Sequence, residues 1–282
     1  LEMMDTNLKH LAVRDRQSNV VGILTNRDLL TAQEQSPFFV IRELASTSSM
    51  DEIVHLQKRT PRLIQNMINS GAKARTITRL ISSISDAILD KLVGFALDEL
   101  GPAPSEFVFL IVGSEGRNEQ TLKTDQDNAI IYADVGKAES SAAKAYFLKF
   151  GERVCTWLDQ AGYDFCKGNV MAMNPKWCQP LSLWKRYFYS WIRVSTPKDL
   201  MQSNIFFDLR GGCGNIGLVD ELRLFLFESL EGWTRFFRDL TVNALGFKPP
   251  LGFFRNFVVE SKGEHRHKLD IKKSMTPIVD IA

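Results

Sequence analysis

The stretch from Phe107 to Tyr132, FVFLIVGSEGRNEQTLKTDQDNAIIY, decides the fold. Its first six residues are apolar and rich in β-formers, which is typical of a buried strand. A Gly-Ser pair follows at once, and the stretch ends in the acidic pair Asp125 and Asp127 and a second apolar run that starts at Ala129. The pattern predicts two strands whose polar connection carries the candidate chemistry.

The acidic pair is a candidate metal site. Side chains of a strand alternate between its two faces, so we expect Asp125 and Asp127 to project to the same face, roughly 7 Å apart along it. Two carboxylates side by side repel each other unless a cation lies between them. Hard oxygen ligands at this spacing suit Mg²⁺, with Mn²⁺ as the alternative.

The Gly-Ser pair is a candidate phosphate site. Gly113 and Ser114 stand at the end of the first strand. If the strand enters a helix there, free backbone N–H groups point outward, and a phosphate can dock on them. Carboxylates that bind metal, opposite a turn that binds phosphate, indicate nucleotidyl transfer.

This arrangement resembles the polymerase-beta-like nucleotidyltransferase superfamily, whose signature is Gly-Ser or Gly-Gly, then an Arg, then Asp-x-Asp. The signature is matched, in order, by Gly113, Ser114, Arg117, Asp125 and Asp127. The wider wording, GSEGRNEQTLKTDQDNAIIY, resembles bacterial nucleotidyltransferases fused to CBS or cyclic-nucleotide-binding domains. These are similar to the catalytic domain of the protein-PII uridylyltransferases. The resemblance implies an α+β fold, with a mixed β-sheet, flanking helices and further helical domains.

The superfamily places a third carboxylate on a later strand, and Asp208 is the candidate. The segment from Asn204 to Arg210, NIFFDLR, is interpreted as an apolar strand with a Gly-rich exit from Gly211. An acidic residue inside such a strand is costly unless it has a partner. The structural alternative is an ion pair of Asp208 with Arg210 or Arg117.

The resemblance implies transfer of a nucleoside monophosphate from an NTP to an acceptor hydroxyl, on a protein side chain, with release of pyrophosphate. The metal ligands, for two Mg²⁺ ions, would be Asp125, Asp127 and Asp208. Asp208 would also help to lower the pKa of the acceptor hydroxyl. The phosphates would be bound by Gly113, Ser114 and Arg117.

Residues 1–34 read as strand, turn, strand and helix, and resemble the second half of a CBS motif. Thr25 and Asp28 match positions that hold an adenosine ribose, so an intact CBS pair would bind an adenine nucleotide and offer a homodimer interface. The alternative is an ordinary helix N-cap. The alternative is favoured because the first half of the motif is missing, and CBS motifs bind in pairs.

Three further regions complete the predicted organisation. Residues 35–99 form helices, the first beginning near Met50 behind a capping box of Ser49 and Glu52. These helices either relay the state of the sensor or simply pack on the catalytic sheet, and we favour packing. Residues 100–210 form the catalytic domain, and residues 211–282 a helical domain that resembles a substrate-binding region and is cut at its end.

Two groups of side chains in the second half of the chain have both a structural and a functional interpretation. An aromatic stripe on the helix after Pro180, which includes Trp184 and Trp191, is expected to be core rather than a base-stacking surface. The basic cluster from Lys262 to Lys273 contains a His-x-His, but no ligand spacing supports a metal there. A solvated charged face is the ordinary interpretation of such a run, and contact with phosphate or an acidic partner is the functional alternative.

Composition excludes some classes of function. The 282 residues carry a formal net charge of +2, so no general attraction to nucleic acid or membranes is expected. No apolar run approaches the ~20 residues of a transmembrane helix, and no signal peptide is recognisable. We therefore expect a cytoplasmic protein whose four cysteines are free thiols. Both ends are expected to be fragment boundaries.

Three rival functions remain open from the sequence. The fold could bind a nucleotide and relay the state of the sensor without turnover. It could modify a small molecule, although a CBS remnant is unusual in such an enzyme. A Ser–His hydrolase would need one of four distant histidines near Ser114.

Overall fold

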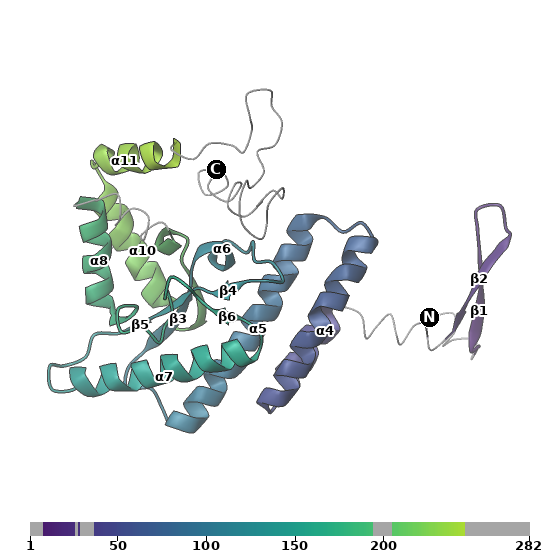
Figure 1. Ribbon diagram of the computed structural model, residues 1–282, viewed down its shortest axis with the longest axis horizontal. Helices are drawn as coiled ribbons and strands as arrows, with labels where there is room; N and C mark the ends of the chain where they lie inside the picture. Colours follow the sequence, from purple (N-terminus) through teal and green to yellow (C-terminus); the bar gives the residue numbers. More distant parts are fainter. Residues whose placement is uncertain (1–7, 26–27, 29–36, 194–204, 246–282) are drawn as a thin grey trace, which may run out of the picture.

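The computed structural model describes residues 8–25, 28, 37–193 and 205–245, and its central feature is a four-stranded sheet (Figure 1). In spatial order the strands are β7 (Cys178–Pro180), β5 (Asn128–Tyr132), β3 (Phe107–Ile111) and β8 (Arg210–Gly214). β3 is antiparallel to both of its neighbours, whereas β5 and β7 are parallel. The predicted α+β class with a mixed sheet is confirmed.

Helices cover both faces of this sheet. Their bounds are α3 (Pro37–Ser46), α4 (Met50–Asn69), α5 (Ala74–Leu100), α6 (Gly113–Gly116), α7 (Ser140–Gln160), α8 (Leu181–Arg193), α10 (Gly217–Leu230) and α11 (Thr234–Leu245). Every residue of β3 and β5 is buried. Because side chains alternate, Phe109 and Ile111 pack in one core with α5 and α7, while Val108 and Leu110 pack in another with α8 and α10.

α4 begins at Met50, as the capping box predicts, but it is not the first helix of the region, because α3 precedes it. The hydroxyl of Ser49 accepts the backbone N–H of Glu52, and the Glu52 carboxylate accepts the backbone N–H of Ser48, so side chains satisfy two amide groups near the start of α4. α5 contributes Ile88 and Leu92 to the core that contains Phe109. α5 thus packs on the sheet and α4 packs against α3 and α5, while a relay by these helices stays a prediction.

The strand predicted around Asp208 is wrong in its position. Residues 205–207 form a helical turn, Asp208 lies in a turn, and the strand begins at Arg210, so the expected Gly-rich exit is the strand β8 itself. Glycine is needed there because a Cβ at Gly212 would lie 2.7 Å from side-chain atoms of both Ile111 and Leu89. The sheet therefore extends past residue 210, and the helical region begins with α10.

The N-terminal residues form the predicted hairpin. β1 (His10–Arg14) pairs antiparallel with β2 (Val20–Thr25). Most of the hairpin is exposed, including Val20 and Ile23. The helix predicted after β2 lies almost entirely outside the described residues, and the CBS assignment stays a prediction.

The C-terminal half contains the predicted helical pattern as far as α11. The aromatic stripe of α8 is core, since Trp184 and Phe188 are fully buried. The basic cluster from Lys262 to Lys273 lies outside the described residues. No helix among those described combines the length and the apolar character that crossing a membrane requires.

Candidate active site at the end of the central sheet

Three chain segments meet at one end of the sheet. Ile111, the last residue of β3, faces Asn128 of β5 on one side and Arg210 of β8 on the other. Gly113, Asp127 and Asp208 lie next to these residues in the sequence. The topology therefore brings the candidate site residues from both sides of β3 to the same end of the sheet. The backbone N–H of Val112 donates to the carbonyl oxygen of Asp127 (3.1 Å) and fixes this end.

The two carboxylates of the acidic pair face the same space, as alternation predicts. A short strand, β4 (Asp125–Gln126), pairs in parallel with β6 (Asp164–Phe165), and this pairing brings in Cys166 directly after β6. Ligand atoms of Asp125, Asp127 and Cys166 all lie within 4.8 Å of one another, and all three residues are half-buried. Two carboxylate oxygens at this spacing fit a divalent cation.

Cys166 is a site residue that the sequence analysis missed. The sequence showed only a cysteine without metal-finger spacing, and the contact depends on the pairing of β4 with β6. Burial raises the pKa of its thiol to about 11, and a hydrogen bond from the thiol to the Asp127 carboxylate adds to the effect. The thiol is therefore protonated at neutral pH.

The amides that alternate with the acidic pair anchor it from behind. Gln126 and Asn128 are both buried, and Gln126 donates to the carbonyl oxygens of Cys155 (3.0 Å) and Tyr163 (3.1 Å). Asn128 donates to Gln126 (3.3 Å) and accepts the backbone N–H of Ala172 (2.7 Å). Buried polar groups with satisfied hydrogen bonds hold a single conformation. The sequence DQDN thus combines two candidate metal ligands, Asp125 and Asp127, with two buried amides that hold the strand in place, Gln126 and Asn128.

The Gly-Ser pair begins α6, a single helical turn. The backbone N–H groups of Gly113, Ser114 and Glu115 have no acceptor within the turn, because the first bond is from Gly116 to Val112. Gly113 has a positive φ of 64°, and an added Cβ would lie 3.5 Å from a carboxylate oxygen of Asp127. The amide groups of the turn therefore lie next to the acidic pair.

Gly116 allows the turn to contact the segment that carries Asp208. An added Cβ at Gly116 would lie 1.9 Å from the backbone oxygen of Asp208, so only glycine permits this approach. The carboxylate of Asp208 bonds to the guanidinium of Arg117, which also contacts Glu119 (3.0 Å). Asp208 is not part of the group of ligand atoms formed with Asp125 and Asp127. The structure thus shows the Arg117 ion pair that the sequence analysis kept as an alternative.

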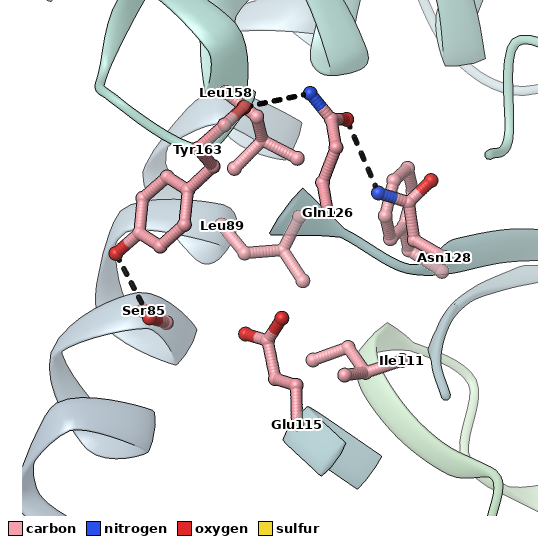
Figure 2. A pocket seen from close by; sticks show the side chains of 9 residues that line it. Ser85, Leu89, Ile111, Glu115, Gln126, Asn128, Leu158 and Tyr163 are labelled. Carbon is pink, nitrogen blue, oxygen red and sulfur yellow. Dashed lines mark hydrogen bonds between the residues drawn. The ribbon is translucent and has the colours of Figure 1, made fainter. Parts of the chain in front are cut away.

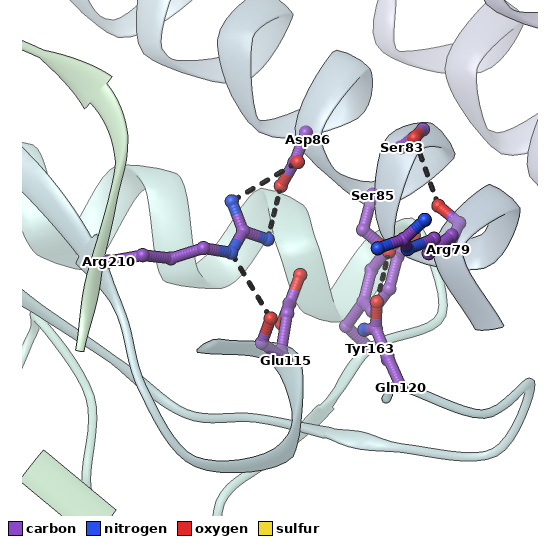
Figure 3. Close-up of polar contacts among 8 residues, drawn as sticks. All are labelled: Arg79, Ser83, Ser85, Asp86, Glu115, Gln120, Tyr163 and Arg210. Carbon is purple, nitrogen blue, oxygen red and sulfur yellow. Dashed lines mark hydrogen bonds and ion pairs between the residues drawn. The ribbon is translucent and has the colours of Figure 1, made fainter. Parts of the chain in front are cut away.

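Behind the turn, an arginine connects three elements. Arg210 of β8 donates twice to the carboxylate of Asp86 on α5 (2.7 and 3.1 Å) and once to the backbone oxygen of Glu115 (3.2 Å), as Figure 3 shows. A bidentate, half-buried pair is geometrically specific. Arg210 therefore fixes the position of the Gly113 turn relative to α5 and the sheet.

The carboxylate of Glu115 points into a cavity of about 20 Å³, large enough for one water molecule (Figure 2). Ser85, Gln126, Asn128 and Tyr163 contribute polar groups to its lining, and Ser85 is hydrogen-bonded to the Tyr163 hydroxyl (2.8 Å). Burial raises the pKa of Glu115 to about 8, and the charges of Asp86 and Asp127 act in the same direction while Arg210 opposes them. Glu115 is therefore mostly protonated at neutral pH.

The predicted regulatory pair, Thr25 and Asp28, is distant from the site residues in the sequence. The Thr25 hydroxyl and backbone N–H both donate to the carboxylate of Asp28 (2.6 and 2.8 Å), and the Asp28 N–H donates back to the Thr25 hydroxyl (3.2 Å). This reciprocal pattern is that of a helix cap. It matches the alternative reading of Thr25 and Asp28.

The fold and the site define an α+β protein with a pair of carboxylates beside a Gly-Ser turn at one end of its central strands. Residues 58–198, half of the 282-residue chain, match the family described as "Putative nucleotidyltransferase DUF294", and the chain belongs to this family. Residues 234–282 match the "Putative nucleotidyltransferase substrate binding domain". No curated protein matches the chain. The first match contains Gly113, Ser114, Arg117, Asp125 and Asp127, and it ends before Asp208.

Proposed function

We propose that this chain is a nucleotidyltransferase of the polymerase-beta-like type that transfers a nucleoside monophosphate from an NTP to an acceptor hydroxyl, with Mg²⁺. One observation carries the proposal: the ligand oxygens of Asp125 and Asp127 lie together at the sheet edge, beside the amide groups of the Gly113 turn. A metal site and a phosphate site within a few ångströms of each other are what a metal–nucleotide complex needs. The family assignment supports this class of activity.

The residues of the site have complementary roles in this proposal. Asp125 and Asp127 would hold Mg²⁺, and bound Mg²⁺ neutralises charge that develops on the leaving pyrophosphate. The N–H groups of Gly113 and Ser114 and the Ser114 hydroxyl would donate hydrogen bonds to the β- and γ-phosphates. Gln126 and Asn128 would keep the ligands in position, since their bonds to the surrounding backbone do not depend on the substrate.

Arg117 and Asp208 would act in sequence. In the structure they form an ion pair with each other. A triphosphate carries more negative charge than one carboxylate, so it would compete with Asp208 for Arg117. Asp208, no longer neutralised, would then accept hydrogen bonding from the acceptor hydroxyl and help to lower its pKa, and could join the metal site.

The acceptor and the regulation follow the family resemblance. Residues 234–282 match a substrate-binding domain, so we propose that this region holds the acceptor, which would be a protein side chain. An N-terminal CBS pair, of which Thr25 and Asp28 would belong to one half, would bind an adenine nucleotide and form a homodimer. The enzyme would act in signal transduction in the bacterial cytoplasm.

The Arg117–Asp208 ion pair favours one alternative function. If Asp208 stayed on Arg117 when nucleotide binds, the site would hold a nucleotide without activating an acceptor hydroxyl. The protein would then be a nucleotide-sensing module whose helices transmit the bound state to a partner. The two functions differ in turnover and share the binding step.

A labelling experiment separates them. The protein is incubated with Mg²⁺, cell extract and each NTP in turn, labelled either on the α- or on the γ-phosphate. The proposal predicts a protein band that carries α-label and no γ-label, because pyrophosphate leaves; the band should be absent with Asp125→Asn/Asp127→Asn. A band with γ-label would indicate phosphoryl transfer. Binding of NTP without any labelled product would support the sensing module.

A further inference from the structure

The third ligand atom of the site, the sulfur of Cys166, is chemically out of place in a site for Mg²⁺ alone. Mg²⁺ binds oxygen ligands and retains several waters, so a thiol adds nothing to its coordination. The sulfur nevertheless lies within 4.8 Å of ligand oxygens of both Asp125 and Asp127, and it is contributed by a different segment of the chain. Soft thiolate ligands select Zn²⁺ and related cations.

We propose that Asp125, Asp127 and Cys166 form a site for a thiophilic divalent cation such as Zn²⁺, which competes with Mg²⁺ and switches off nucleotide binding. Because the same two carboxylates would hold Mg²⁺, the regulatory part of this inference rests on the proposed function. The binding part does not. On binding, Zn²⁺ replaces the thiol proton of Cys166, which is released to water, and no redox change occurs.

The geometry is close to that of a zinc site. Ligand atoms around a tetrahedral zinc ion lie about 3.5 Å apart, given bond lengths of about 2.0–2.3 Å. The three ligand atoms here are within 4.8 Å, so each needs to move by only about an ångström. Asp127 and Cys166 directly follow the paired strands β4 and β6, so a movement of this size would fall to their side chains and not to the paired backbone.

A three-ligand site leaves a fourth position open, which is typical of zinc sites that exchange water or substrate. In the proposed zinc-bound state a water molecule occupies this position. Zn²⁺ would draw Asp125 and Asp127 toward Cys166 and into tetrahedral geometry, whereas Mg²⁺ requires an octahedral arrangement with the triphosphate. Zinc binding and productive binding of Mg²⁺–NTP should therefore exclude each other.

The chain provides a matched control cysteine. Cys213 on β8 is also half-buried and its thiol also donates to an aspartate, Asp90 (3.3 Å), but no third ligand joins that pair among the described residues. Cys155 and Cys178 are buried, and burial raises the pKa of each thiol to about 12. A metal that binds through a thiol at one equivalent should therefore depend on Cys166 and not on Cys213.

Cobalt titration tests the binding part, because Co²⁺ replaces Zn²⁺ and a thiolate ligand gives it a strong charge-transfer band in the near ultraviolet. With reduced protein, we expect this band to saturate at one equivalent for wild type and Cys213→Ser, and to be absent for Cys166→Ser. Added Zn²⁺ should remove the band. A band that persists in Cys166→Ser, or no band in the wild type, would overturn the inference.

Calorimetry of Mg²⁺–NTP binding tests the regulatory part and keeps the two proposals separate. One equivalent of Zn²⁺ should weaken Mg²⁺–NTP binding to the wild type by on the order of 100-fold, and its effect on Cys166→Ser should be at least about tenfold smaller. The zinc effect is taken for each protein as the ratio of its own Mg²⁺–NTP affinities without and with Zn²⁺, so a change in basal affinity in Cys166→Ser does not enter the comparison, and near-ultraviolet circular dichroism shows that this variant is folded. A cobalt band without any Mg²⁺–NTP binding would keep the metal site and reject the proposed function. Equal zinc sensitivity of both proteins would reject the switch.

Discussion

Replacing Glu115 by Gln should make the protein more stable, and the gain should grow with pH. The pKa of Glu115 is raised from 4.5 to about 8, chiefly by burial, so the folded protein keeps the proton through the range in which the unfolded chain loses it. Folded protein then binds more protons than unfolded chain, and the free energy of unfolding falls as pH rises from about 4.5 to about 8. Glutamine is neutral throughout and has nearly the same shape.

The magnitude follows from the pKa difference. One pKa unit corresponds to about 1.4 kcal/mol, so Glu115 should reduce stability by about 3 kcal/mol at pH 7 and by at most about 5 kcal/mol above pH 8. Below pH 4.5 the carboxyl is protonated in both states and the reduction vanishes. Glu115→Gln removes this reduction, provided that its amide finds partners in the small polar cavity.

Denaturant unfolding at pH 5, 7 and 9 measures the effect. EDTA should be present, since a cation on the nearby Asp127 would itself lower the pKa of Glu115. The control is Glu152→Gln, which removes an exposed carboxylate from α7. A gain in stability for Glu115→Gln that does not change between pH 5 and pH 9 would refute the reasoning about the buried carboxyl.

The other predictions concern the turn and the acidic pair. Asp125→Asn/Asp127→Asn should raise the thermal midpoint in EDTA, because it relieves the repulsion between two adjacent carboxylates; a lower midpoint would contradict this. Ser114→Gly should retain turnover at roughly a tenth to a hundredth of the wild-type rate in the labelling assay, because the amide groups of the turn survive; complete inactivity of the folded variant would indicate a covalent role. Gly116→Ala should cost about 3 kcal/mol or more in denaturant unfolding, because its methyl group would lie 1.9 Å from a backbone oxygen. Gly94→Ala, on open helix surface, should leave stability unchanged or raise it by up to about 1 kcal/mol, and an equal loss in both variants would contradict the steric argument.

Some elements were predictable because local sequence alone specifies them: a strand buried on both faces is a continuous apolar run, and a helix start is indicated by its capping residues. The apolar run of β3 and the cap at Ser49 are of this kind, and both lie where the pattern placed them. The acidic pair was also predictable, since alternation along a strand requires no tertiary information. Whether Asp125 and Asp127 bind metal stays a prediction.

The region around Asp208 was misread because glycine is a poor strand former by propensity. Residues 210–214 form a strand because they pair with β3, and glycine suits position 212 because Leu89 and Ile111 crowd it; both are tertiary properties. Ile205, Phe206 and Phe207, directly before Asp208, are good strand formers and therefore suggested a strand. In the structure they are helical and pack in the core with α8 and α10.

Cys166 and Glu115 were not predicted as site residues because their roles come from contacts between distant segments. Cys166 reaches the acidic pair through the pairing of β4 with β6, and Glu115 is enclosed by α5. The sequence did contain a signal for the two amides of the site. Alternation in DQDN places Gln126 and Asn128 on the face opposite the acids, where buried amides require hydrogen-bond partners. It contained no such signal for Cys166 or Glu115.

The central claim is that Asp125 and Asp127 bind a nucleotide through Mg²⁺, and calorimetry with a non-hydrolysable NTP tests it most directly. The wild type and Asp164→Asn, which alters an exposed aspartate paired with Asp125 across the β4–β6 ladder but outside the ligand group, serve as references. We predict binding by both in Mg²⁺, loss of binding in EDTA, and no binding by Asp125→Asn/Asp127→Asn in either condition. Equal affinity of the wild type with and without Mg²⁺, or full affinity of the double variant, would contradict the account.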